Sequence, residues 1–216
     1  MADFTRNGYG QVEPNQLSAQ KTGQIYASLP LKEEVKVLQN GEFMYYDYVS
    51  GTVCADDSTG VAEPMLVFNE IKLYEPFWRT SYKDFAMIRK GDNYVTSKLA
   101  TAGYGERSDQ AGVAANPAHS DYPYRMDGIA PRLLKTNIGD IYTTNMVETD
   151  EDAGSAVTYT VGDLLEPVKN ATTKTLQLKT FTPAQTGDKP TGMAWAVVKV
   201  YTMPDGQQGL KLQRVQ

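Results

Sequence analysis

The sequence is poor in the residues that usually build catalytic centres and covalent frameworks. Among 216 residues there is one cysteine, Cys54, and one histidine, His119. A single cysteine excludes an intrachain disulfide framework and a cysteine-rich zinc site, and it fits a reducing compartment. Cys54 stands in a strand-like stretch, where a free cysteine usually serves as a small hydrophobic residue. His119 lies in an irregular segment, and the adjacent Ser120 and Asp121 cannot meet it in the geometry of a catalytic triad.

Long apolar runs and an excess of basic residues are also missing. No stretch approaches the ~18 apolar residues of a membrane-spanning helix, and residues 1–24 carry no targeting signature. The formal net charge is -5 at pH 7, whereas wrapping of nucleic acid or binding to anionic membranes needs a basic surface. We therefore expect neither a nucleic-acid partner nor a membrane partner.

Motifs that would support an enzyme or a metal site are weak. The acidic run at 148–152 lacks the ligand spacing and the flanking helices of an EF-hand, so a solvated turn is the favoured interpretation. The glycines between residues 102 and 112 do not have the spacing of a dinucleotide-binding loop. Tyrosines in YYDY (residues 45–48), with Trp78, could stack on a sugar, which leaves a carbohydrate-binding module open as an alternative. We predict a non-enzymatic protein with no cofactor and no metal.

What the sequence does contain is material for strands and turns. There are 14 tyrosines, 18 glycines and 11 prolines, and few stretches have a long helical period. The Asn40-Gly41 pair separates two runs rich in Val, Phe and Tyr, which predicts a hairpin with a type I′ turn. Residues 65–74 form another strand-like run, whereas residues 81–91 fit either a capped helix or a strand.

The clearest β pattern lies in residues 132–216. Short alternating runs are separated there by turn clusters, at spacings typical of a small barrel or sandwich. The last two runs flank Pro204-Asp205-Gly206 and predict a hairpin, whose strands are held on both edges if the sheet is closed or nearly closed. Gly139-Asp140 and Gly162-Asp163 echo each other, and a common turn dipeptide explains this echo better than a repeat does.

Alternation along these runs also predicts which side chains face the interior. Strict alternation cannot bury both Val197 and Val198, and we expect Val198 to be the inward residue. The predicted inward face comprises Ile141, Val161, Leu176, Leu178, Trp195, Val198, Val200, Leu210 and Leu212.

These patterns predict a mainly β protein with four regions. The C-terminal β-barrel or sandwich follows a β-rich N-terminal region, and an extended arm precedes both. The regions are an extended N-terminal arm (1–30), a β-rich N-terminal region (31–101), an irregular linker or contact segment (102–131) and a C-terminal β-barrel-like domain (132–216).

The arm supplies the candidate partner-binding residues Phe4, Tyr9, Ile25 and Tyr26. Residues 1–30 show no periodicity, so by themselves they cannot offset an ordering entropy of about 1–2 kcal/mol per residue. They can order only by burying these side chains against another surface. We expect that surface to belong to a partner; the alternative is an arm that packs back on its own body and adds a strand to a sheet.

A resemblance to a known family rests on the C-terminal part. The stretch YRMDGIAPRLLKTNIGDIYTTNMV, the VGDLL turn and the ending GMAWAVVKVYTMPDGQQGLKLQ resemble head decoration (auxiliary capsid or cement) proteins of tailed bacteriophages, over residues 124–216. The resemblance implies a virion protein, made in the host bacterial cytoplasm, that binds the outside of the capsid through the major capsid protein. It also implies a homotrimer that stabilises the shell without catalysis. A tail or fibre-attachment adaptor of the virion is the alternative within this class.

Overall fold

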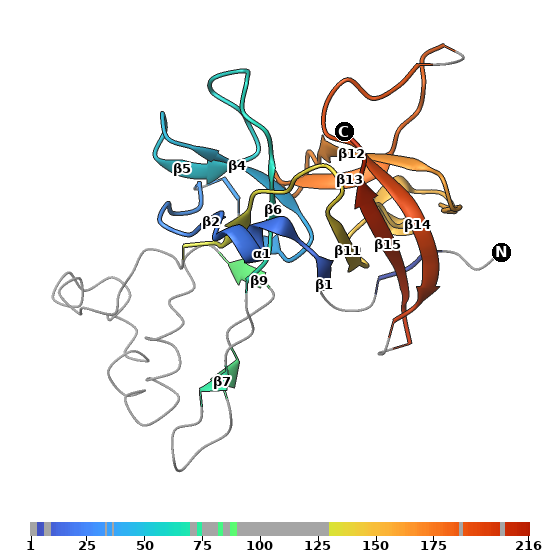
Figure 1. The fold of residues 1–216 in the computed structure, drawn as a ribbon, viewed down its shortest axis with the longest axis horizontal. Helices are drawn as coiled ribbons and strands as arrows, with labels where there is room; N and C mark the ends of the chain where they lie inside the picture. Colours follow the sequence, from blue (N-terminus) through green and yellow to red (C-terminus); the bar gives the residue numbers. More distant parts are fainter. Residues whose placement is uncertain are drawn as a thin grey trace, which may run out of the picture.

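The described part of the protein is mainly β and is dominated by one large antiparallel sheet. The computed structural model describes residues 4–6, 10–32, 34–35, 37–69, 73–74, 82–83, 87–89, 130–185, 188–203 and 206–216. Within these residues an 11-stranded sheet curls into a half-barrel (Figure 1). The predicted β-rich fold class is therefore confirmed.

Neighbours in the large sheet come from distant parts of the chain. Two small sheets and two short helices complete the described elements. The small sheets pair β3 (Val37–Gln39) with β9 (Met87–Arg89) and β7 (Leu73–Tyr74) with β8 (Tyr82–Lys83), and the helices are α1 (Ser18–Thr22) and α4 (Asp150–Ala153). From one edge of the large sheet to the other, neighbouring strands follow the order β1 (Val12–Gln16), β11 (Ile141–Thr144), β15 (Gln208–Arg214), β14 (Trp195–Thr202), β12 (Leu164–Lys169), β13 (Leu176–Thr180), β4 (Phe43–Asp47), β6 (Met65–Val67), β10 (Leu133–Leu134) and β2 (Ile25–Tyr26). Strand β5 (Thr52–Cys54) lies outside this order and pairs with β4.

The C-terminal hairpin forms as predicted and lies inside the sheet rather than at its edge. Strands β14 and β15 pair along most of their lengths. The outer side of β15 pairs with β11, and the beginning of β14 pairs with β12. A strand with a neighbour on each side has its backbone groups satisfied and does not fray. This explains why so regular a run occupies residues 197–216.

A β-bulge decides which valine of the hairpin is buried. Val197 pairs with Leu212, but the next pair is Lys199 with Lys211, so Val198 is the extra residue on its strand. Val197 is 2% exposed and Val198 is 42% exposed. The prediction that Val198 faces inward is therefore wrong, because the bulge shifts the alternation by one residue.

Most of the predicted inward face is correct, and the errors have local causes. Val161 is exposed because it lies in the turn before β12 rather than in a strand. Ile141 is half-buried at the start of β11, and Val200 packs partly buried against the core. The residues confirmed as buried are Leu176, Leu178, Trp195, Leu210 and Leu212.

The bulge yields a test with adjacent residues as variant and control. Val197→Asp should destabilise the fold by about 3 kcal/mol or more, because it buries a carboxylate without a partner. Val198→Asp should change stability by no more than about 0.5 kcal/mol, since the side chain projects into solvent. Urea denaturation of both variants measures the difference. Equal losses in both variants would contradict the observed register.

The Asn40-Gly41 pair forms a turn but not the predicted hairpin. Gly41 has a φ of 92°, and the Glu42 N–H donates to the Gln39 carbonyl (3.3 Å), as expected for a tight turn. However, β3 pairs with β9 and β4 pairs with β5, β6 and β13, so the flanking strands enter different sheets. The Gly41 N–H donates instead to the Val67 carbonyl (3.0 Å). Tertiary pairing overrides the local hairpin signal here.

Two ambiguous runs also resolve into strands of different sheets. The run 65–74 contributes β6 to the large sheet and β7 to a two-stranded sheet, so it is not one strand. In the run 81–91, the described residues are strands β8 and β9, which favours the strand interpretation over the capped helix. Residues 70–72 of the first run and residues 81, 84–86, 90 and 91 of the second lie outside the described part.

The N-terminal segment is part of the body, which corrects the expected partner-dependent arm. Strand β1 pairs with β11, and β2 pairs with β10. Phe4, Leu17 and Ala19 are all buried in the main core. Apolar side chains of this segment are therefore removed from water within the same chain, which is the alternative that the sequence left open.

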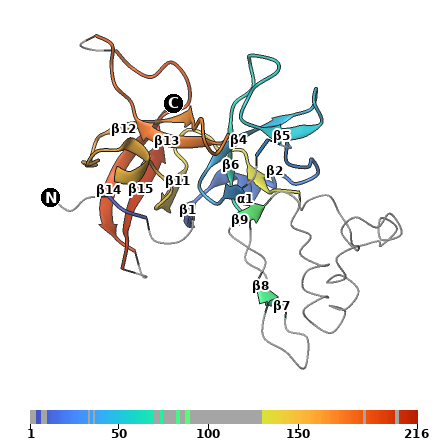
Figure 2. The same ribbon diagram turned by 180° about the vertical axis from the view of Figure 1, so that it is seen from behind.

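One sheet and one core run through both predicted halves. In Figures 1 and 2 the strands of the N-terminal half lie beside the C-terminal strands, and β4 pairs with β13. The buried Trp195 ring contacts Phe43 of β4 (centroids 5.8 Å apart) and Tyr142 of β11 (4.8 Å). The expected boundary at 102–131 therefore does not separate two sheets. Residues 102–129 of that segment lie outside the described part.

Candidate functional site

The four predicted partner-binding residues have different surroundings. Phe4 is buried, and its ring meets Tyr159 edge-on at 5.1 Å between centroids. Ile25 and Tyr26 are half-buried in β2 and pack against the core. Tyr9 lies outside the described residues. Phe4 is therefore a core residue, whereas Ile25 and Tyr26 keep part of their surface accessible.

Tyr26 belongs to a row of three tyrosine rings that leads to an exposed loop. Its ring lies 5.3 Å from that of Tyr46, which lies 5.1 Å from that of Tyr48. The Tyr46 hydroxyl accepts a hydrogen bond from the Ser28 N–H (3.0 Å), which holds the middle ring in place. Tyr48, in the turn between β4 and β5, is 73% exposed. Edge-to-face packing of this kind stiffens an exposed aromatic side chain.

Two more exposed apolar side chains project from the loops around Tyr48. Val49 is 74% exposed in the same turn, and Val61 is 86% exposed in the loop between β5 and β6. The two loops project from the same end of the N-terminal half (Figures 1 and 2). We call Tyr48, Val49 and Val61 the loop-tip surface.

Aspartates hold both of these loops in shape. The Asp47 carboxylate accepts hydrogen bonds from the Val49 N–H (2.9 Å) and the Ser58 hydroxyl, so it joins one loop to the other. Asp57 accepts from the N–H of Ala62 (2.7 Å) and that of Thr59 (2.9 Å). The hydrogen bond from Ser58 is the main cause that lowers the pKa of Asp47. The loop-tip surface is therefore built on ordered loops with an ionised carboxylate at their base.

Two Gly-Asp turns are built alike and present further apolar side chains. They span Asn137–Asp140 and Thr160–Asp163, and their glycines have φ values of 95° and 98°. In each turn the aspartate side chain accepts from the backbone N–H of the first residue, at 2.9 and 2.7 Å respectively. The second residues, Ile138 and Val161, are exposed. The dipeptides are turns as predicted, and the likeness extends to their hydrogen bonds.

Both turns are tied to the C-terminal hairpin. The Gly139 N–H donates to the Arg214 carbonyl (2.8 Å) in β15, and the Gly162 N–H donates to the Val197 carbonyl (2.9 Å) in β14. The exposed side chains of the turns thus lie beside the ends of the two hairpin strands. We call Ile138, Val161 and Val198 the turn surface.

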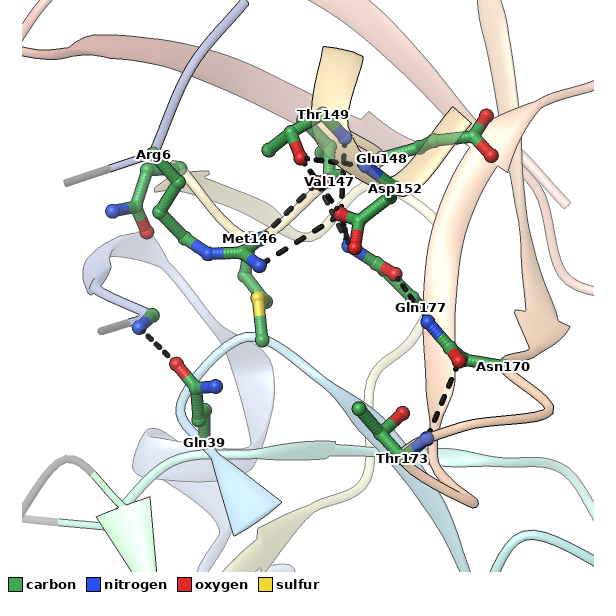
Figure 3. A network of polar contacts seen from close by, with 12 residues as sticks. Arg6, Gln39, Met146, Val147, Glu148, Thr149, Asp152, Asn170, Thr173 and Gln177 are labelled. Carbon is green, nitrogen blue, oxygen red and sulfur yellow. Dashed lines mark hydrogen bonds and ion pairs between the residues drawn. The ribbon is translucent and has the colours of Figure 1, made fainter. Parts of the chain in front are cut away.

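A partly buried polar network occupies the region where β13 meets β4 (Figure 3). Gln177 donates from Nε2 to the Val147 carbonyl and to Asp152 Oδ2, both at 2.9 Å. Arg6 Nη2 lies 3.7 Å from the same Asp152 oxygen. Although burial opposes ionisation, hydrogen bonds from Gln177 and Thr149 hold the pKa of Asp152 below its usual range. The network fixes the N-terminal segment to the C-terminal strands.

Glu42 is the most unusual group of this region. Its side chain is buried, with Oε2 accepting from the Gln39 N–H (2.7 Å) and Oε1 from the Thr175 hydroxyl (2.7 Å). Burial raises the pKa of Glu42 to about 7, against the opposing effects of these hydrogen bonds and of Arg6. Sequence reasoning missed this residue. The signal was its spacing, because Glu42, immediately before β4, lies two residues before Met44 and four before Tyr46, which are both buried.

Other residues weighed for chemistry have structural surroundings where they are described. Cys54 is buried and donates to the Asp56 carbonyl. The acidic run contains α4, whose capping box joins Thr149 and Asp152, so it is a one-turn helix rather than a simple turn. Among the described residues no three His, Cys, Asp or Glu side chains are grouped as a metal ion would require. His119 and Trp78 lie outside that part of the chain.

Two general searches are negative. None of the helices in the described ranges combines the length and the apolar character needed to cross a bilayer. Comparison of the chain with protein-family models, curated proteins and solved structures finds no match.

Proposed function

We propose that this protein is a non-enzymatic virion component that binds the outside of a bacteriophage capsid and stabilises it. The observation that carries the proposal is the continuous sheet, in which the first described strand, β1, and the last, β15, pair with opposite edges of β11. A sheet that pairs the N-terminal and C-terminal strands with one central strand resists fraying of either segment, which suits a protein that reinforces a shell. The resemblance of residues 124–216 to head decoration proteins supports the same role.

The loop-tip surface is the docking surface in this proposal, and its occupant is the major capsid protein. Tyrosine is enriched among the residues that dominate binding energy, because it combines a large contact area with few rotatable bonds. Tyr48 fits this role because its ring packs edge-to-face against the ring of Tyr46, which restricts its motion. Val49 and Val61 add apolar area around it. Homotrimer formation on the capsid remains part of the proposal.

Binding to capsid particles that lack the protein tests this assignment. Replacing Tyr48, Val49 and Val61 together by Ser should weaken binding by about 100-fold or more, since each exposed anchor contributes roughly 1 kcal/mol. The matched control replaces Ile138, Val161 and Val198 by Ser, which removes a similar apolar area from the turn surface. Co-sedimentation with particles measures the binding, and the wild-type protein should also raise the temperature at which the particles rupture.

The outcomes separate the alternatives. Loss of binding in the control variant alone would move the docking surface to the Gly-Asp turns. Failure of the wild-type protein to bind any shell, with density at the tail or fibre base in electron micrographs of the particle, would favour the adaptor. A glycan-array signal that disappears in Tyr48→Ala would favour a carbohydrate-binding module instead.

A further inference from the structure

Among the described strands of the large sheet, β13 and β4 have the shortest paired stretch. These strands share a single residue pair, Leu176 with Phe43, whereas the neighbouring pair β12 and β13 shares five. The ladder that joins the two halves of the half-barrel is therefore narrow at this point. Side chains beside this pair must contribute more to holding the halves together than side chains elsewhere in the sheet.

Glu42 and Thr175 provide such a contact next to the single pair. Glu42 precedes Phe43, Thr175 precedes Leu176, and the Thr175 hydroxyl lies 2.7 Å from Glu42 Oε1. The same hydroxyl lies 2.7 Å from that of Thr173, where either oxygen can be the donor. A carboxylate therefore receives a hydrogen bond from Thr175. A protonated carboxyl can instead donate to Thr175, which then donates to the half-buried Thr173.

We propose that Glu42 is a proton-operated latch for the β4–β13 junction, which holds the two halves of the sheet together when protonated and loosens when it ionises. The two threonine hydroxyls reverse together as the proton leaves for solvent. This proposal does not depend on binding to a capsid, since it concerns the junction within one chain.

The charges around Glu42 favour neither state strongly. Arg6, from the N-terminal segment, lowers its pKa, and Asp152, on α4, raises it; these two groups also pair with each other. Desolvation is the dominant cause, because burial removes the carboxylate from solvent and disfavours its charged form. The folded state therefore binds the proton more tightly than the unfolded chain does. The stabilisation is complete below about pH 4.5 and is lost as the pH rises through about 7.

Glu42→Gln tests the latch because it keeps the shape of the side chain and cannot ionise. We expect the folding equilibrium constant of the wild type, relative to this variant, to fall on the order of 100-fold between pH 4.5 and pH 8. Urea denaturation at several pH values measures the ratio. Amide hydrogen exchange in β4 and β13 should be faster in the wild type than in the variant at pH 8, and equal at pH 5. Glu151→Gln, on the exposed face of α4, should show a ratio that stays constant over this range.

A ratio for Glu42→Gln that does not change with pH would overturn the proposal. So would a pH-dependent ratio without any difference in exchange at the junction, since Glu42 would then act on global stability alone. If the variant does not fold at any pH, NMR of the side-chain carboxyl carbons in the wild type tests the proposal by measuring the titration midpoint of Glu42. A titration midpoint near 7 for Glu42 supports the latch, and a midpoint below 5 rules it out.

Discussion

Deletion of residues 1–24 should abolish cooperative thermal unfolding, or lower the melting temperature so far that little folded protein remains at 37 °C. The deletion removes Phe4, Leu17 and Ala19 from the core and leaves β11 without its neighbour β1. Burial of one large apolar side chain contributes roughly 1.5–3 kcal/mol. The total loss of roughly 5 kcal/mol or more is comparable to the whole stability of many domains. Circular dichroism during heating measures the effect.

Point variants separate packing from chain length in this experiment. Leu17→Ala should cost about 2–5 kcal/mol, since Leu17 is fully buried. Gln16→Ala, one residue earlier and exposed, should change stability by no more than about 0.5 kcal/mol. A shortened protein that melts like the wild type but no longer associates with a partner would restore the arm that the sequence predicted.

Trp195→Ala should destabilise the protein by about 3–5 kcal/mol, as expected when a fully buried aromatic ring is removed. The indole contacts Phe43 on one side and Tyr142 on the other, so the cavity opens between the two halves of the sheet. We expect the unfolding transition to broaden as well, because the halves lose their shared packing. Urea denaturation followed by circular dichroism measures both changes.

Trp195→Phe is the matched control for this cavity. Trp195 Nε1 has no hydrogen-bond partner within the described ranges, so phenylalanine loses apolar area but no polar contact. The cost should be roughly half that of the alanine variant or less. Similar losses in both variants would show that the indole nitrogen matters and that the volume of the ring does not.

The C-terminal hairpin and the turns around it could be predicted from the sequence because their signals are local. Alternation with period two places Leu210 and Leu212 on one face whatever the rest of the chain does. Positive φ values at Gly139 and Gly162 likewise follow from what glycine allows in a turn. The mainly β class rests on many signals of this kind, which agree with one another.

Only the tertiary structure decided the choice of partner for each strand. Asn40-Gly41 makes its turn, yet β4 pairs with β6 and β13 because a strand gains more from two buried neighbours than from one adjacent in sequence. Alternation showed that Val197 and Val198 cannot both be buried, but it could not show which one the bulge exposes, since both are equally apolar. The destination of the N-terminal segment and the burial of Glu42 depend on contacts more than 100 residues apart along the chain. Such contacts form where the other strands, once assembled, leave apolar surface exposed to water. No local sequence pattern shows where that surface will be.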